Sequence, residues 1–347
     1  MIGRFSLLHG LLSIALPSLA ALFLTTACIS INLNNPNRGA KRLSEVTLHT
    51  DRQGSGCLML MTCGLVGSGP ANTVLVIPLR GAIVEQDDLG RNITPGGIKR
   101  QLDMARRDPS IRAVILKINS PGGAVGATDV IFRQLQRYST QQKVPIYAHV
   151  DTIGASGAYY AAMAARRINA RPTAMVGSIG VILRSFGVTG LMQKVGVQYR
   201  SVKSGKNKDS LSPFTELDKA DEAHYQHQIT RSYDRFLKII LASRSDRIAE
   251  ARLREVADGR VYDARSAKDS GLIDSIGYFD TFYEEVKKEN GLGEARMIAY
   301  LPAEASNNNI YEVNAPPEPP ASLEEFFDAA TLLHRNGLYY IWDPGVY

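Results

Sequence analysis

A serine between small residues is the first candidate for covalent chemistry in this chain. Ser156 lies in Gly-Ala-Ser-Gly-Ala-Tyr-Tyr (residues 154–160), after a mostly apolar run and before an alanine-rich segment. At such a strand-to-helix junction, free backbone N–H groups and the helix dipole stabilise negative charge, which suits a nucleophile whose reaction passes through an oxyanion. Taken alone, the pattern more often marks a serine that caps a helix on a glycine turn.

Two other stretches contain the groups that such a nucleophile needs. Asn-Ser-Pro-Gly-Gly at residues 119–123 follows another apolar run, and its glycines would let backbone N–H groups approach a substrate carbonyl as an oxyanion hole. Gly-Lys-Asn-Lys-Asp at residues 205–209 supplies Lys208. The simpler interpretations are a tight turn for the first stretch and a solvated, lysine-rich loop for the second.

The histidines do not mark the base that would remove the serine proton, although histidine is the usual base. They lie in an export segment, a linker, an apolar strand, a long helix and the tail: His9, His49, His149, His224, His227 and His334. A histidine triad stays open but has no motif to support it. A lysine can do the same work where burial holds it neutral, because desolvation lowers its pKa from about 10.4 by several units. Lys208 is the candidate for that role.

Apolar runs alternate with helical patterns from residue 73 onwards, which predicts an α/β fold. We expect strands at residues 74–79, 113–118, 144–150, 197–202 and 297–300, and helices at 94–108, 125–138, 190–196, 216–243, 248–256, 264–270 and 281–290. Right-handed crossovers between such strands give a mostly parallel sheet with flanking helices, followed by a helical C-terminal extension. Ligand groups collect beyond the carboxyl ends of parallel strands, so residues 119–123 and 154–156 should be neighbours.

The first 28 residues have the features of an export signal. A basic start at Arg4 precedes a mostly apolar run at residues 7–24, and Thr-Thr-Ala-Cys follows at residues 25–28. A lipoprotein signal acylated at Cys28, an uncleaved membrane anchor and a cleaved signal are all open, and each places the rest of the chain outside the cytoplasm. Residues 29–72 are expected to be a linker, in which Cys57 and Cys63 either pair or serve as small apolar side chains.

The remaining composition excludes some classes of protein. The chain has 347 residues, of which 44% are hydrophobic and 21% charged, as in globular proteins. Its net charge of +6 comes from scattered basic residues, which disfavours a nucleic-acid partner. No cysteine–histidine pair has metal-ligand spacing, so we expect no zinc site. Residues 301–347 are expected to be a proline-rich linker with an aromatic end (338–342) that could dock on the core, a partner subunit or a membrane.

Five motifs, taken in order, resemble a family. Residues 119–123, 154–160, Gly-Ser-Ile-Gly-Val at 177–181, Lys-Ser-Gly…Lys-Asp…Leu-Ser-Pro at 203–213 and Asp-Gly-Arg-Val-Tyr at 258–262 resemble bacterial signal peptide peptidases of the SppA type. These are serine–lysine peptidases of the Clp protease/crotonase superfold. The resemblance extends over about residues 74–300 and implies a peptidase domain at residues 73–300.

The resemblance implies a role for individual residues. Ser156 matches the nucleophile, and Lys208, three residues after Gly205, matches the general base. Gly123 and Gly157 match the oxyanion hole. The family's reaction uses neither metal nor nucleotide, so the resemblance implies no metal and no cofactor.

The resemblance also implies a setting. The family cleaves signal-peptide remnants and other short apolar or unfolded peptides at the membrane, which implies a membrane-anchored protein of the bacterial cell envelope. One copy of the motif set implies the short form, a homo-oligomeric ring in which serine and lysine come from different protomers. We therefore expect no hydrogen bond between Ser156 and Lys208 within a single chain.

Two other functions are compatible with parts of the pattern. A crotonase-type acyl-CoA enzyme would use the glycine amides for a thioester enolate, but coenzyme A is cytoplasmic and the chain has an export signal. A non-catalytic membrane scaffold would bind apolar segments without cutting them, but it would have no use for an intact serine and lysine.

Overall fold

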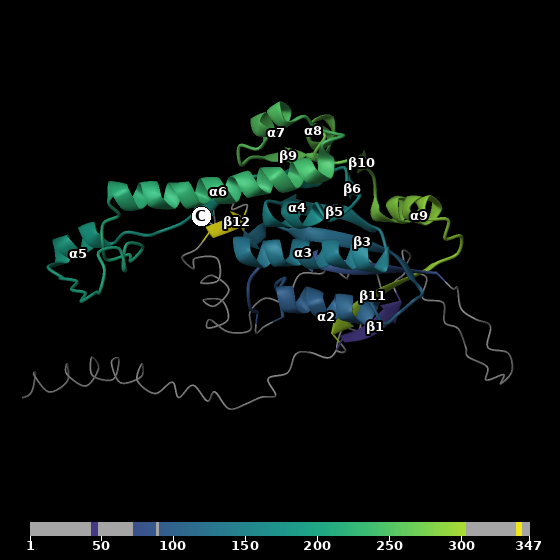
Figure 1. The fold of residues 1–347 in the computed structure, drawn as a ribbon, viewed down its shortest axis with the longest axis horizontal. Helices are drawn as coiled ribbons and strands as arrows, with labels where there is room; N and C mark the ends of the chain where they lie inside the picture. Colours follow the sequence, from purple (N-terminus) through teal and green to yellow (C-terminus); the bar gives the residue numbers. More distant parts are fainter. Residues whose placement is uncertain (1–42, 48–71, 88–89, 303–337, 342–347) are drawn as a thin grey trace, which may run out of the picture. The chain divides into compact units, whose positions relative to one another are not determined.

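The computed structural model describes residues 43–47, 72–87, 90–302 and 338–341. A mostly parallel sheet forms the centre of this part of the chain (Figure 1). Its main path has the spatial order β1-β11-β2-β3-β5-β6-β10. The bounds are β1 Leu43–Thr47, β2 Thr73–Arg80, β3 Ile111–Ser120, β5 Ile146–Ala155, β6 Arg167–Ala170, β10 Ser275–Ile276 and β11 Arg296–Pro302. Neighbouring strands on this path are parallel, except that β1 is antiparallel to β11. The predicted α/β fold is confirmed.

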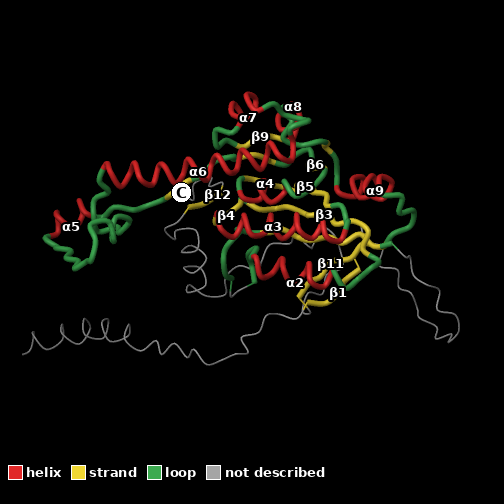
Figure 2. The backbone as a smooth tube through the Cα atoms, viewed as in Figure 1, coloured by secondary structure: helices red, strands yellow, loops and turns green. Residues whose placement is uncertain are grey.

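Helices pack on both faces of this sheet (Figure 2). The helices of the larger core include α2 Pro95–Ala105, α3 Val125–Gln142, α4 Gly157–Ala162 and α6 Lys219–Arg244. Leu75 and Ile77 of β2 join this core, whereas Val74 and Val76 join the other core, under α9 Phe279–Glu289. Because successive side chains of a strand point to opposite faces, a strand covered on both sides is apolar along nearly its whole length.

The predicted helices at 190–196, 248–256 and 264–270 are present as α5 Thr189–Val195, α7 Glu250–Val256 and α8 Ala264–Asp269. Two short strands extend the sheet beside β5. β7 Met175–Gly177 pairs in parallel with the end of β5, and β9 Val261–Asp263 pairs antiparallel with β7. The later helices are therefore tied to the sheet through β9.

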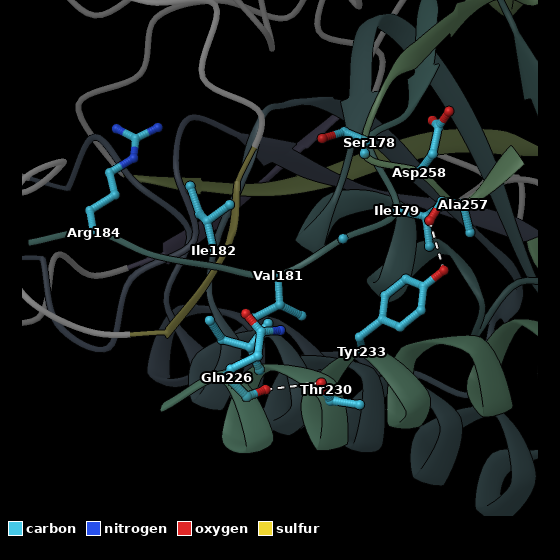
Figure 3. A pocket seen from close by; sticks show the side chains of 13 residues that line it. Ser178, Ile179, Val181, Ile182, Arg184, Gln226, Thr230, Tyr233, Ala257 and Asp258 are labelled. Atoms are coloured by element: carbon cyan, nitrogen blue, oxygen red, sulfur yellow. Dashed lines mark hydrogen bonds between the residues drawn. The ribbon is translucent and has the colours of Figure 1, made fainter. Parts of the chain in front are cut away.

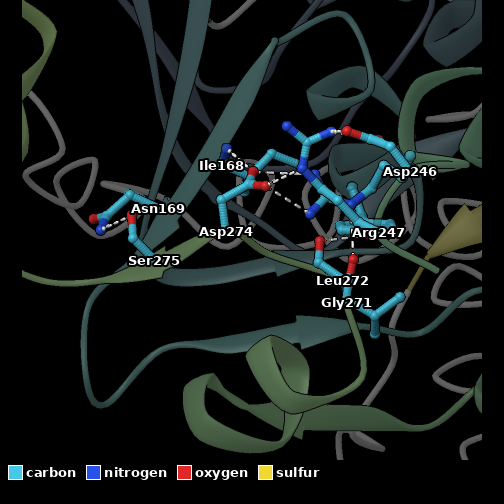
Figure 4. Close-up of polar contacts among 10 residues, drawn as sticks. Ile168, Asn169, Asp246, Arg247, Gly271, Leu272, Asp274 and Ser275 are labelled. Carbon is cyan, nitrogen blue, oxygen red and sulfur yellow. Dashed lines mark hydrogen bonds and ion pairs between the residues drawn. The ribbon is translucent and has the colours of Figure 1, made fainter. Parts of the chain in front are cut away.

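A buried arginine fastens the end of α6 to the sheet. Arg244 is 1% exposed, donates to both carboxylate oxygens of Asp274 (3.1 and 3.2 Å) and donates to the Gly271 carbonyl (2.9 Å). Asp274 also accepts from the Ile168 N–H at the start of β6 and pairs with Arg247 (Figure 4). Burial by itself would raise the pKa of Asp274, but these donors and charges outweigh it and the pKa is lowered.

A second, smaller sheet has the order β4-β12-β8. Its strands are β4 Gly122–Ala124, β8 Ile182–Leu183 and β12 Leu338–Ile341, with β12 antiparallel to both neighbours. The aromatic end of the tail was expected to dock on the core, on a partner subunit or at a membrane. Residues 338–341 dock on the core.

Two expectations need correction. The strand predicted at 197–202 is wrong: Val197, Tyr199 and Val202 are exposed, and no strand within the described ranges pairs there. Alternation of apolar residues yields a strand only where a partner takes up the main-chain groups. The linker predicted at 29–72 contains β1, which joins the sheet through β11. The turn expected at 119–123 is present, and it joins the end of β3 to the start of β4.

The predicted export segment (1–28), with Cys28, lies outside the described residues, as do Cys57 and Cys63. No helix within the described ranges is long and apolar enough to cross a bilayer.

Candidate active site

Ser156 stands at a sharp turn between β5 and α4. Its backbone has φ 52° and ψ −116°, a combination that residues other than glycine seldom adopt. Two hydrogen bonds hold it there: Ser156 N–H donates to the Gly177 carbonyl (2.7 Å), and the Ser156 carbonyl accepts from Tyr160 N–H (2.9 Å). Backbone strain of this kind costs about 1–3 kcal/mol and is concentrated at functional sites.

The Ser156 side chain does not cap α4. It makes no hydrogen bond to the helix that it precedes, whereas Thr94 and Asp218 accept from the first-turn N–H groups of Gly97 and Asp221 in α2 and α6. Ser156 is 1% exposed, and its Oγ has no hydrogen-bond partner among the described residues. A buried hydroxyl without a partner is uncommon, and a catalytic role is one explanation for it. The geometry therefore favours a nucleophile over a helix cap.

The two glycine-containing stretches meet at the ends of neighbouring strands, as predicted. Ser120 of β3 is paired with Gly154 of β5, two residues before Ser156. The Ser120 hydroxyl accepts from the Gly122 N–H (3.1 Å), and Gly122 has φ 96°. This bond turns the chain from β3 into β4, so that β4 lies beside the nucleophile turn.

Gly123 fits its place because it lacks a side chain. A Cβ at this position would lie 1.9 Å from the Ile83 carbonyl oxygen, far inside contact distance. Ile83 is also bonded to both flanking residues: its N–H donates to Gly122 and its carbonyl accepts from Ala124, each at 2.8 Å. The backbone of Gly123 is thus fixed in position next to α4, as an oxyanion-hole donor must be.

Gly157, the other predicted donor, is the first residue of α4 and is buried. N–H groups in the first turn of a helix have no partner within the helix. Gly157 therefore has the position that the oxyanion role requires, directly after the serine.

The motif at residues 258–262 supports the nucleophile turn from outside. Its Arg260 carbonyl accepts from Ser178 N–H (2.8 Å), and Val261 is paired with Gly177 through β9 and β7. Gly177 has φ 117° and supplies the carbonyl that holds Ser156. β9 therefore pairs with β7, and β7 in turn holds the backbone of Ser156.

Lys208 is not brought to Ser156 within this chain. It is exposed in a turn closed by its own N–H donating to the Gly205 carbonyl (3.2 Å). Figure 1 shows α5 and its flanking loops beyond the amino end of α6, away from α4. Since Ser156 Oγ has no described partner, no hydrogen bond joins it to Lys208. The two neighbouring lysines form ion pairs within the chain: Lys203 pairs with Asp209, and Lys206 pairs with Asp218.

Two other basic groups near the strand ends are held by structural partners. His149 is a buried strand residue, as predicted: its Nδ1 lies 2.7 Å from Asn169 Oδ1 and its ring packs edge-on against Phe279. Burial lowers its pKa to about 4. Lys117 is fully buried in β3, where it is ion-paired with Asp151, and burial lowers its pKa. Neither bonds with Ser156 Oγ.

A polar cluster behind α4 is not foreseen from the sequence. The Tyr160 hydroxyl donates to Asp129 Oδ1 (2.5 Å), which also accepts from Arg235 Nη2 (2.6 Å). These bonds join α4 to α3 and α6. Tyr160 belongs to the serine motif, so the sequence contains one member of this cluster. Its partners Asp129 and Arg235 are far away in sequence, and no local pattern links them to it.

A cavity of about 560 Å³ has Ser178, the residue after Gly177, in its wall, but neither Ser156 nor Gly123 lines it. One wall is residues 178–182 and the others are α6 and residues 257–259 (Figure 3). Ile179, Val181 and Ile229 make the lining partly apolar, and Tyr233 donates to the Ala257 carbonyl (2.7 Å). The lining also includes the charged residues Arg184 and Asp258, so its apolar part is the wall formed by Ile179, Val181 and Ile229.

No group of three or more potential metal ligands is present in the described part of the chain. The group that the described residues present at this turn is the Ser156 hydroxyl, a potential nucleophile.

Comparison with known proteins agrees with this chemistry. Residues 139–293 match Peptidase family S49, a range that includes Ser156 and Lys208 and begins after Gly123. An Enterococcus faecium protein named "Putative signal peptide peptidase SppA" is 33% identical over 200 residues, which is 58% of this chain and 57% of the relative.

Two further relatives are named as proteases. "Protease 4" of Haemophilus influenzae is 30% identical over 226 residues, covering 65% of this chain and 36% of the relative. "Serine protease SPPA, chloroplastic" of Arabidopsis thaliana is 30% identical over 223 residues, covering 62% and 32%. The chain thus spans between 32% and 57% of the length of these three relatives.

Proposed function

We propose, from the SppA-type peptidase S49 domain that this chain carries, that it is a serine endopeptidase acting on short apolar peptides. One observation carries the proposal: Ser156 is held in a strained turn, is buried and has an Oγ without a described partner. Strain, burial and a free hydroxyl serve a nucleophile, and none of them serves a helix cap.

The reaction uses four groups of the protein. Ser156 Oγ attacks the scissile carbonyl carbon while the neutral amine of Lys208 takes the hydroxyl proton. The main-chain N–H groups of Gly123 and Gly157 stabilise the oxyanion. The C–N bond then breaks and the lysine gives the proton to the leaving amine. A water molecule, deprotonated by the same lysine, next attacks the acyl carbon, the ester bond to Ser156 Oγ breaks, and the lysine returns the proton to that oxygen.

The lysine comes from a neighbouring copy in this proposal. A lysine acts as a base only where burial keeps its amine neutral, and Lys208 is exposed in the single chain. The segment that carries it also exposes large apolar side chains: Phe186, Leu191, Val195, Val197, Tyr199, Val202, Phe214 and Leu217. Such a concentration of apolar surface marks a protein-protein contact. We call residues 186–217 the apolar arm. Docking of this arm on a second copy would bury both its apolar side chains and Lys208.

The substrate follows from the lining of the cavity beside β8. Ile179, Val181 and Ile229 favour aliphatic side chains. Short apolar peptides such as signal-peptide remnants fit this lining, and they are released at membranes. We therefore include association with the cell-envelope membrane in the proposal.

Peptide turnover by matched variants tests the assignment of residues. A quenched peptide with an apolar centre is incubated with the unaltered protein, Ser156→Ala, Lys208→Ala and Lys206→Ala. The first two changes should reduce kcat by about 10⁴-fold or more, whereas Lys206→Ala, which removes an exposed lysine of the same loop, should leave kcat within about twofold. Equal turnover by all four proteins would exclude the dyad, and peptide binding without turnover in the unaltered protein would indicate a scaffold.

Mixing the two inactive variants tests where the lysine comes from. If each site takes its lysine from a neighbour, a reassembled equimolar mixture of Ser156→Ala and Lys208→Ala contains about a quarter of intact sites. Recovery of about a quarter of the activity is expected. A mixture as inactive as its components would contradict assembly across subunits.

A further inference from the structure

The strand that leads into the nucleophile turn is longer than its neighbour over the same stretch of sheet. Ile118 of β3 is opposite Val150 of β5. The next pair is Ser120 opposite Gly154, so β5 uses three residues, 151–153, where β3 uses one (Figure 1). The chain is tightly folded there, because a Cβ at Gly154 would lie 2.8 Å from a methyl carbon of Val150. The extra residues form a β-bulge, an irregularity that is concentrated next to active sites.

The bulge sets the place of the nucleophile relative to the oxyanion strand. Ser120 comes three residues before Gly123, and Gly154 comes two residues before Ser156. The pairing of Ser120 with Gly154 therefore fixes how far apart Gly123 and Ser156 lie along the sheet. A strand advances about 3.3 Å per residue, so loss of the two extra residues would displace the serine by about 6.6 Å. An oxyanion hydrogen bond of about 3 Å does not tolerate such a displacement.

A buried ion pair holds the bulge in place. Asp151, its first residue, is 5% exposed, and its two carboxylate oxygens accept from Lys117 of β3 and from Arg171. Lys117 is fully buried. Arg171 directly follows β6, and its N–H donates to the Val150 carbonyl (2.9 Å). The carboxylate thus ties β5 to β3 on one side and to the end of β6 on the other.

The bulge also lies where β5 changes its neighbour on that other side. β6 pairs with residues 147–150 of β5, whereas β7 pairs with residues 153–155. β7 ends at Gly177, whose carbonyl accepts from the Ser156 N–H. Residues 151–153 therefore direct the strand from β6 to β7, the strand that holds the serine.

We propose that Asp151, held by Lys117 and Arg171, is a positioning residue that fixes this bulge and so places Ser156 beside the oxyanion strand. The inference rests on the proposed function of Ser156 as nucleophile. Asp151 acts through the backbone of β5, since the Ser156 Oγ has no hydrogen-bond partner among the described residues.

Fold stability alone does not require charges at these positions. Two charges lose their hydration when they are buried, and apolar side chains of similar volume often give equal or greater stability. What Lys117 and Asp151 add is a fixed geometry, because charge-assisted hydrogen bonds to two donors orient a carboxylate. Positioning and stabilisation therefore predict different results when both charges are removed.

A double substitution separates the two roles. Lys117→Met combined with Asp151→Leu keeps the volume and removes the buried pair, so the free energy of unfolding should be maintained. Arg171 is 29% exposed and stays hydrated. We expect kcat for a quenched peptide to fall by about ten- to hundredfold with KM within about twofold, because misplaced reacting groups lose stabilisation in the transition state. The control Lys99→Ala with Asp103→Ala removes an ion pair from the surface of α2 and should leave kcat unchanged.

Two milder variants keep the test valid if the double variant does not fold. Arg171→Gln removes one tie at a partly exposed site and leaves the pair of Lys117 with Asp151. It should lower kcat by about three- to tenfold. Arg171→Lys retains the charge and should restore most of the kcat. Full activity of Arg171→Gln together with a fully active double variant would overturn the proposal.

Hydrogen exchange separates this inference from the proposed catalysis. Backbone amides of residues 153–160 should exchange several-fold faster in the double variant than in the unaltered protein, while those of residues 95–105 in α2 should be unchanged. This local change supports the positioning role even if no form of the protein cleaves peptides. Equal exchange and equal kcat would overturn it, as would a uniform rise in exchange that accompanies lowered stability. Either of these results would leave the peptidase assignment intact wherever turnover depends on Ser156.

Discussion

The N–H of Ser156 donates a 2.7 Å hydrogen bond to the carbonyl of Gly177, the last residue of β7. The nucleophile candidate is therefore held by a neighbouring strand as well as by its own helix. Because Gly177 has φ 117° and its strand is paired with β9, the position of the serine depends on residues that follow it by about a hundred positions. Substitutions in β7 and β9 should therefore reduce activity even though these strands hold the serine and do not carry it.

A methyl group at Gly177 should displace Ser156. The positive φ disfavours any side chain, and a Cβ would lie 3.0 Å from the Tyr262 ring and 3.1 Å from the Arg260 carbonyl. We expect Gly177→Ala to reduce kcat by at least about tenfold and to lower the free energy of unfolding by about 1–3 kcal/mol. Peptide turnover and urea denaturation measure the two effects. Gly187→Ala is the control, because nothing lies within 4 Å of a Cβ there and its φ is ordinary.

A methyl group at Gly123 should remove an oxyanion donor. The Cβ would lie 1.9 Å from the Ile83 carbonyl oxygen, so the backbone must move. We expect Gly123→Ala to reduce kcat by about 10²–10³-fold, the usual effect of losing one such donor. Gly96→Ala in α2, where the nearest atom is 3.7 Å from a Cβ, should be close to neutral. A fully active Gly123→Ala protein would exclude this strand from the oxyanion hole.

Removing the side chain of Arg244 should destabilise the fold. The change leaves Asp274 partly buried without its principal partner, and breaking a buried ion pair costs about 3–5 kcal/mol. Chemical denaturation measures the loss. Arg247→Ala is the matched control, since Arg247 contacts the same carboxylate but is 33% exposed, and its removal should cost less. An equal cost for both changes would contradict the dominant role of Arg244.

Acid should weaken the fold through His149 before the carboxylates titrate. Burial lowers the pKa of His149 from 6.5 to about 4. The unfolded chain therefore takes up a proton near pH 6.5 that the folded chain refuses, and stability falls as the pH decreases towards 4. We expect a loss of roughly 2 kcal/mol between about pH 6.5 and pH 5.

Two histidine variants isolate this effect. His149→Gln does not titrate and retains an amide that can bond with Asn169, so denaturation midpoints should lose most of their pH dependence in this window. His224→Gln, at an exposed site on α6, should retain the dependence of the unaltered protein. The same slope in His149→Gln would assign the acid sensitivity to other groups.

The central fold could be predicted from local patterns. Apolar runs at 74–79 and 113–118 became β2 and β3 because both faces of these strands are covered, and this pattern is unambiguous in sequence. The meeting of residues 119–123 with 154–156 also followed, since it depends only on the parallel order of two strands.

Features that depend on distant partners could not be predicted. β1 and β12 are short segments whose pairing with β11 and β4 no local pattern specifies. Lys117 lies in an apolar run, and its burial depends on Asp151 in another strand. The strand expected at 197–202 shows the converse case, because its alternating pattern has no partner strand in the described part of the chain.

The separation of Ser156 from Lys208 has a consequence for the life of a newly made chain. A protease must not attack the proteins around it while it is being made and folded. With the serine buried in the core and the lysine exposed on an apolar arm, a solitary molecule has no assembled dyad. If the lysine comes from a second copy, proteolytic competence begins only when enough copies accumulate, so local abundance itself times the onset of cleavage.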